Sequence, residues 1–151
     1  MNRLIEDYLR TRGVRYFRGH HDDEYFYLVD FVVGAYRGRL NVHLEAGGAD
    51  RDTVLISITP DRFFPAELRE DLDGLVARWN AGAPPLEAVV HPSSDPRLVG
   101  AMAHGSHRPA DAAALGDYVD AAVGSAIELF GAMPDPAAGA RQTPGTLRDA
   151  G

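Results

Sequence analysis

The chain has 151 residues, of which 45% are hydrophobic and 25% charged, and its formal net charge is -7. This length suits one domain with a real core, and the composition is typical of a soluble globular protein rather than a disordered or membrane-spanning one. An acidic chain with scattered arginines lacks the concentrated basic face that nucleic-acid binding requires, so we expect no nucleic-acid partner. No apolar run approaches the roughly 20 residues needed to span a bilayer, so we expect no membrane partner either.

Two residue types are missing, and their absence limits the possible chemistry. The sequence has no cysteine and no lysine, so all fifteen of its strongly basic residues are arginines. Disulfides, thiolate metal sites, cysteine nucleophiles and lysine Schiff bases are therefore excluded. With no recognisable catalytic motif present, we expect a protein without enzymatic activity and without a cofactor. The N-terminus carries acids and no continuous apolar segment, which predicts a cytoplasmic location.

The N-terminal segment predicts a short amphipathic helix that ends at Gly13. Its apolar residues recur at helical spacing: Leu4, Ile5, Tyr8 and Leu9. Residues 14–17 then form a short predicted strand, and the polar residues 19–23 form a turn. This helix has a narrow apolar stripe, so we expect it to dock on the rest of the fold.

Three longer predicted strands follow, over residues 24–33, 39–45 and 53–59. The first is almost continuously aromatic or β-branched, which predicts a strand covered on both faces and placed near the centre of a sheet. The other two alternate apolar and polar residues, so one face of each should be exposed to water. Their short connecting turns predict antiparallel neighbours.

A predicted helix over residues 65–80 separates these strands from a second hairpin. Its apolar stripe consists of Leu68, Leu72, Leu75 and Trp79. We expect this helix to supply one wall of the core, with Trp79 packed against the sheet and Asn80 bonding backbone groups where the helix ends.

The C-terminal part predicts a hairpin and a final helix. Residues 86–91 and 97–103 form the predicted strands, and residues 105–109 a loop. The last helix has an apolar stripe rich in small residues: Leu115, Val119, Ala122, Ala126 and Leu129. Residues 134–151 are rich in proline and glycine, which predicts a disordered C-terminal tail.

These elements predict a single α+β domain over residues 1–133. An antiparallel sheet, made of a meander plus the second hairpin, should pack against helices in the order α-β-β-β(-β)-α-β-β-α.

The order of the elements, together with local sequence features, resembles the YbjN family of bacterial proteins, whose fold is similar to that of type III secretion chaperones. The matching features are Tyr8-Leu9, the tyrosine-rich hairpin from Tyr25 to Phe31, Arg78-Trp79-Asn80, the hairpin from Leu86 to Ala103 and the final alanine-rich helix. The resemblance covers about residues 2–131. It implies a non-enzymatic protein-interaction module, chaperone-like or regulatory, that is often a homodimer and has no defined active site.

Two groups of residues are candidate sites. His20, His21, Asp22 and Asp23 offer nitrogen and oxygen ligands, joined by His43 and Glu45 if the sheet brings them there; the alternative to an interaction module is therefore a metal-dependent enzyme or small-ligand-binding protein using this turn. Adjacent residues on an extended chain point to opposite sides, which favours a solvated turn.

A partner-binding surface could be formed by aromatic residues: Tyr25, Tyr27, Phe63 and Phe64. The two tyrosines share one face of their strand and would bind a partner if they were uncovered, whereas burial in the core is the favoured alternative. The two phenylalanines either pack at the start of the following helix or form an exposed contact patch.

Overall fold

A seven-stranded antiparallel sheet is the framework of the protein in a computed structural model that describes residues 1–21 and 23–134. The elements in chain order are α1 (Asn2–Thr11), β1 (Tyr16–Arg18), β2 (Glu24–Val33), β3 (Tyr36–Gly47), β4 (Thr53–Pro60), β5 (Phe64–Pro65), the 3-10 helix η1 (Ala66–Leu68), α2 (Arg69–Ala81), β6 (Glu87–Pro92), β7 (Leu98–His107) and α3 (Ala112–Gly131). The predicted α+β class and element order are confirmed, with β5 and η1 added. The predicted tail lies, from residue 135 onward, outside the described residues.

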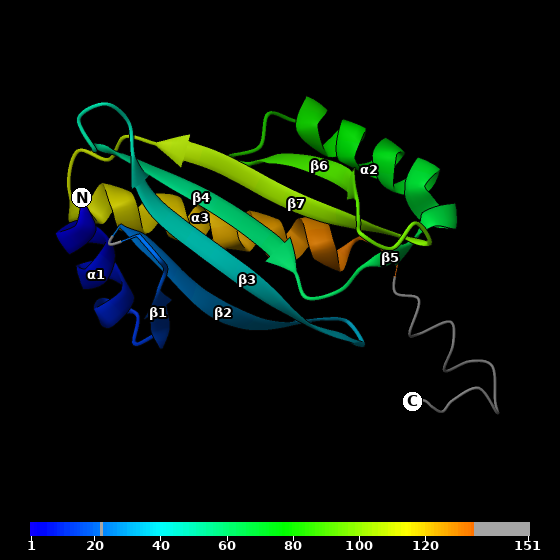
Figure 1. The fold of residues 1–151 in the computed structure, drawn as a ribbon, viewed down its shortest axis with the longest axis horizontal. Coiled ribbons are helices and arrows are strands. Elements are labelled where there is room, and N and C mark those ends of the chain that lie inside the picture. Colours follow the sequence, from blue (N-terminus) through cyan, green and yellow to red (C-terminus); the bar gives the residue numbers. More distant parts are fainter. Residues whose placement is uncertain (22, 135–151) are drawn as a thin grey trace.

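Strands β1, β2, β3, β4 and β7 lie side by side in this order (Figure 1). The two-residue β5 pairs with the start of β7 on the same side as β4, and β6 pairs with the other side of β7. Residue Ala103 of β7 shows this arrangement, since it pairs with Ile58 of β4 and with Ala88 of β6. The two outer boundaries of the sheet are therefore β6 on one side and β2, with the three-residue β1 beyond it, on the other.

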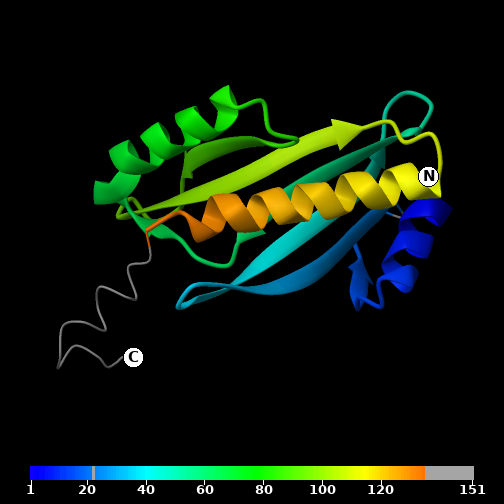
Figure 2. The same ribbon diagram turned by 180° about the vertical axis from the view of Figure 1, so that it is seen from behind.

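Helix α3 runs across one face of the sheet, and α1 lies beside it (Figure 2). Each residue of the predicted apolar stripe on α3 is at most 1% exposed: Leu115, Val119, Ala122, Ala126 and Leu129. The two helices are joined through Asp120 of α3, which accepts hydrogen bonds from the Tyr8 hydroxyl at 2.7 Å and from Arg12. The principal wall of the core is thus α3, with the predicted wall of the middle helix at the edge of the sheet.

Helix α2 lies along β6, at the edge of the sheet (Figure 1). Leu72 and Val76 are its buried residues, while the other members of the predicted stripe, including Trp79, are partly buried and pack against the core. The stripe therefore faces the fold as predicted, although it covers only this edge.

The face of the sheet under α3 is apolar because its strands alternate. Leu40, Val42 and Leu44 of β3 face the helices, and Val54, Ile56 and Ile58 of β4 do the same, each at most 2% exposed. The opposite phase of these strands is polar except for the exposed Leu55 of β4. The predicted alternation of both strands is confirmed.

Two boundaries differ from the sequence expectation. Strand β7 continues to His107, because residues 105–107 pair with β4, so most of the expected loop is strand. The side chain of Asp111 accepts a hydrogen bond from the Ala114 amide at 2.9 Å and caps α3. In the described part of the chain, every helix is too short or too polar to span a bilayer.

Candidate functional site

The face of the sheet opposite α3, here called the open face, is the front surface in Figure 1 and has no described helix over it. Five large apolar side chains on this face are between 39% and 62% exposed: Phe17, Phe26, Leu28, Val32 and Leu55. Strand β2 supplies three of them. The prediction that β2 is covered on both faces and lies near the sheet centre is therefore wrong, because only one face packs in the core and β2 lies next to the sheet edge.

One row of paired residues crosses the open face from edge to edge. In sheet order it consists of Phe17, Phe26, His43, Ser57, His104 and Glu87. The His43 ring stacks on Phe26 with a centroid distance of 4.6 Å. The Ser57 hydroxyl, which is directly opposite His43 in the ladder, donates to the Met102 sulfur at 3.1 Å.

The outer edge of β2 is only half paired. Strand β1 pairs with Tyr25, Phe26 and Tyr27, and no described strand lies beside residues 28–33 on that side. The hairpin partner β3 occupies the inner side of β2 along its whole length. Residues 28–33 therefore form a free edge, which here means this unpaired outer side of β2, and such an edge is a template for another strand.

The edge formed by β6 is closed by side chains of α2. The Asn80 amide donates to the Ala88 carbonyl oxygen and accepts from the Ala88 amide, both at 2.9 Å. Arg69 reaches the Val90 carbonyl oxygen at 3.4 Å. The predicted role of Asn80 in bonding backbone groups is confirmed, and the bonds satisfy groups that a partner strand would otherwise use.

The aromatic residues predicted to contact a partner divide between core and surface. Tyr25, Tyr27 and Phe64 are at most 3% exposed, whereas Phe63 is 55% exposed. Burial, followed by a 2.6 Å hydrogen bond to Glu6, raises the pKa of Tyr25 to about 12. The two tyrosines were predicted to contact a partner only if their rings were uncovered, and both rings are buried within this chain. The exposed apolar residues Phe26, Leu28 and Val32 lie on the opposite phase of β2, and the sequence signal for them is the apolar character of both phases.

Among the described residues of the predicted metal-binding turn, His20, His21 and Asp23 do not bring their donor atoms close enough together to share one ion. The carboxylate of Asp23 is held by Arg51, and His21 lies 3.9 Å from Glu24. Burial acts to raise the pKa of Asp23, but the hydrogen bonds from Arg51 and the backbone outweigh it, so the pKa is lowered overall. Asp22 lies outside the described residues.

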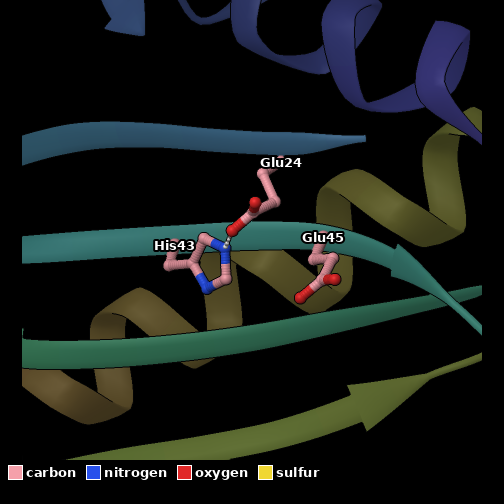
Figure 3. Close-up of side chains that lie close together, drawn as sticks. All are labelled: Glu24, His43 and Glu45. Atoms are coloured by element: carbon pink, nitrogen blue, oxygen red, sulfur yellow. Dashed lines mark hydrogen bonds and ion pairs between the residues drawn. The ribbon is translucent and has the colours of Figure 1, made fainter. Parts of the chain in front are cut away.

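A different trio of metal-ligand types meets on the open face, at the first residues of β2. Glu24, His43 and Glu45 have donor atoms that all lie within 4.8 Å of one another, and all three residues are partly buried. Figure 3 shows their side chains on the same side of the strands, with the His43 ring directed at Glu24. His43 and Glu45 were named in the sequence analysis, whereas Glu24 was missed because its pairing with Glu45 is set by the register of β2 and β3.

The comparisons with known proteins bear on the fold. The sequence matches no protein-family model and no curated protein. The structure is similar to the crystal structure of YbjN from E. coli, a protein proposed to be a transcription regulator, with a TM-score of 0.60, 12% sequence identity, and coverage of 91% of this chain and 90% of that chain. At this identity the likeness shows the fold alone, and it confirms the YbjN-like fold predicted from the sequence.

Proposed function

We propose that this protein is a non-enzymatic protein-interaction module that pairs with a second copy of itself along the free edge of β2. The observation that carries the proposal is the combination of unpaired backbone over residues 28–33 with exposed Leu28 and Val32 on the same strand. Addition of a strand gives affinity through main-chain hydrogen bonds and specificity through alternate side chains. A cytoplasmic location stays a prediction.

The order of side chains along the free edge supports a second copy as the occupant. On the open face, Leu28 precedes and Val32 follows Asp30 at equal spacing. The pattern of apolar, charged and apolar side chains is therefore the same whichever way the strand runs. An antiparallel pairing with a two-fold axis near Asp30 would place Leu28 of one copy opposite Val32 of the other. Arg39 lies 2.7 Å from Asp30 and neutralises the carboxylate that this axis would bring near its copy.

The closed edge of β6 explains why pairing would stop at two copies. An isologous contact uses the same edge from both subunits, whereas chains with two free edges can add strands indefinitely. Asn80 occupies the backbone groups of Ala88, so a further strand has no ready place to pair there. The expected assembly is therefore a closed dimer with one continuous sheet.

A module of this kind works by contact rather than by chemistry, which agrees with the chaperone-like or regulatory role implied by the family resemblance. The similar E. coli protein is described as a regulator and not as an enzyme. A net charge of -7 does not favour direct contact with phosphate groups, so regulation through a protein contact is the form we propose.

The proposal is tested by light scattering coupled to size-exclusion chromatography on the full chain over a range of concentrations. We expect a dimer whose dissociation constant rises at least about tenfold in Leu28→Lys and Val32→Lys, because charged side chains protect edge strands from pairing. Both residues are exposed in the single chain, so its unfolding free energy should change by less than about 0.5 kcal/mol.

The matched control is Leu55→Lys, which introduces the same charge on the open face but away from the β2 edge. This variant should dimerise like the wild type. A wild-type chain that stays monomeric at the highest soluble concentration would overturn self-pairing. Loss of the dimer in Leu55→Lys, with retention in Leu28→Lys, would place the interface on the face instead of the edge.

A further inference from the structure

The trio on the open face comes from two neighbouring strands, at the far end of β2 from the proposed dimer edge. Glu24 begins β2, and His43 and Glu45 lie two residues apart on the same face of β3. The Nε2 atom of His43 is 3.0 Å from Oε2 of Glu24, and one donor atom from each residue lies within 4.8 Å of the others. We propose that Glu24, His43 and Glu45 bind one divalent transition-metal ion, of the class of Zn²⁺ or Mn²⁺.

The pairing register supplies a physical reason for a cation at this place. Glu24 and Glu45 are directly opposite each other in the β2–β3 ladder. Like charges in this position destabilise a sheet. Among the described ion pairs, none joins an arginine to either glutamate, and the nearby Arg51 is engaged by Asp23. A bound cation would remove the repulsion between the two carboxylates.

The surrounding contacts hold two of the three ligands in place before an ion binds. The His43 ring is stacked on Phe26 at an interplanar angle of 17°, which fixes the direction of Nε2. The other carboxylate oxygen of Glu24, Oε1, accepts a hydrogen bond from the His21 amide at 3.3 Å, so Oε2 stays directed toward the imidazole. Figure 3 shows the carboxylate of Glu45 beside this pair, and a side-chain rotation of Glu45 would complete the site.

The donor set decides the class of ion. One imidazole with two carboxylates suits Zn²⁺, Mn²⁺ and similar ions, whereas Mg²⁺ and Ca²⁺ prefer oxygen donors alone. Bonds of about 2.0–2.2 Å place the donor atoms around one zinc ion about 3–4 Å from one another. The donor atoms of the three residues would therefore have to approach one another by about 1 Å when the ion binds. Three protein ligands leave coordination positions of the ion for water, as in zinc sites where a water molecule can be replaced by another ligand.

The test uses the full chain after removal of metal with a chelator, titrated with Zn²⁺, Mn²⁺ and Mg²⁺ by calorimetry and thermal unfolding. We expect one Zn²⁺ or Mn²⁺ per chain and a rise in melting temperature, with little response to Mg²⁺. Glu45→Gln should weaken Zn²⁺ binding at least about tenfold. In the metal-free state this variant should melt at the wild-type temperature or above it, because the repulsion with Glu24 is gone.

Glu87→Gln is the matched control, since it removes an exposed glutamate from the open face outside the trio. This variant should bind Zn²⁺ like the wild type, and so should His20→Asn and His21→Asn. No metal-dependent shift in the wild type would overturn the proposal, and so would equal Zn²⁺ affinity in Glu45→Gln. Loss of binding in the His20 and His21 variants alone would assign the ion to the turn instead. None of these outcomes depends on whether the chain dimerises.

Discussion

The two edges of the sheet differ in how their backbone groups are satisfied. At β6, the side chains of Asn80 and Arg69 reach the backbone from α2, and Ala88 has both its amide and its carbonyl bonded by Asn80. At β2, no described strand pairs with residues 28–33 on the outer side, and Leu28 and Val32 are exposed. The fold thus closes one edge with its own helix, while residues 28–33 at the other edge have no described partner strand on the outer side.

One well-placed side-chain amide can bond the backbone groups at the edge of a sheet and so block the addition of another strand there. An asparagine side chain carries a donor and an acceptor at the spacing of a peptide group, so it imitates the next strand at one residue. The β2 edge has a charged pair, Asp30 with Arg39, but no such imitation. Substitutions at Asn80 and Arg69 test how the β6 edge is closed, and a substitution at Asp30 tests what the charged pair contributes at the β2 edge.

The largest expected effect comes from opening the β6 edge with Asn80→Ala. The substitution leaves the amide and the carbonyl of Ala88 without their partner, at a residue that is 2% exposed. We expect the free energy of unfolding in urea to fall by about 2–4 kcal/mol, because buried unsatisfied groups cost about 1–3 kcal/mol each.

The control for Asn80→Ala is Asn41→Ala, which removes an asparagine from an exposed position on the open face. Its cost should be within about 0.5 kcal/mol. A similar loss in the two variants would show that the amide of Asn80 does not specifically protect the β6 edge.

A smaller effect is expected for Arg69→Ala at the same edge. Its bond to the Val90 carbonyl oxygen is long, at 3.4 Å, and its ion pair with Asp73 is exposed. We expect a loss of about 0.5 kcal/mol in the same urea experiment. Arg78→Ala on the same helix controls for helix propensity and should cause less loss; the reverse order would rule out a role for Arg69 at the edge.

The smallest effect concerns the free edge and depends on pH. The hydrogen bond from Arg39 lowers the pKa of Asp30 below its ordinary value of 3.8. A carboxyl group with a lowered folded pKa contributes stability above its ordinary pKa and loses it as the pH falls through the folded value. In dilute, monomeric samples, wild type should therefore lose more melting temperature than Asp30→Asn between about pH 5 and about pH 2.

Because both side chains of this pair are exposed, solvent screening keeps the difference small and it should shrink further in high salt. Identical pH profiles for wild type and Asp30→Asn in low salt would show that the pair contributes nothing to the stability of the free edge.

The most instructive difference between sequence and structure lies in β2. A strand that is apolar in both phases predicted cover on both faces, and only Tyr25, Tyr27 and Phe31 received it from this chain. The apolar character of both phases is real, but in this chain only one of the two faces packs in the core, and Phe26, Leu28 and Val32 are exposed. Two residues of the trio, His43 and Glu45, could be placed on one face of β3 from the sequence. Glu24 joins them only through the register of β2 and β3, which the sequence does not show.

The class, the order and the core-facing phase of the elements can be predicted from the sequence, because they depend on periodicities of 3.6 and 2 residues within short stretches of chain. The helix that covers the sheet, the edge that Asn80 closes and the pairing of Glu24 with Glu45 are visible only in the folded chain. Those relations join residues that are far apart in the sequence, and local pattern carries no information about the strand order and register that bring them together.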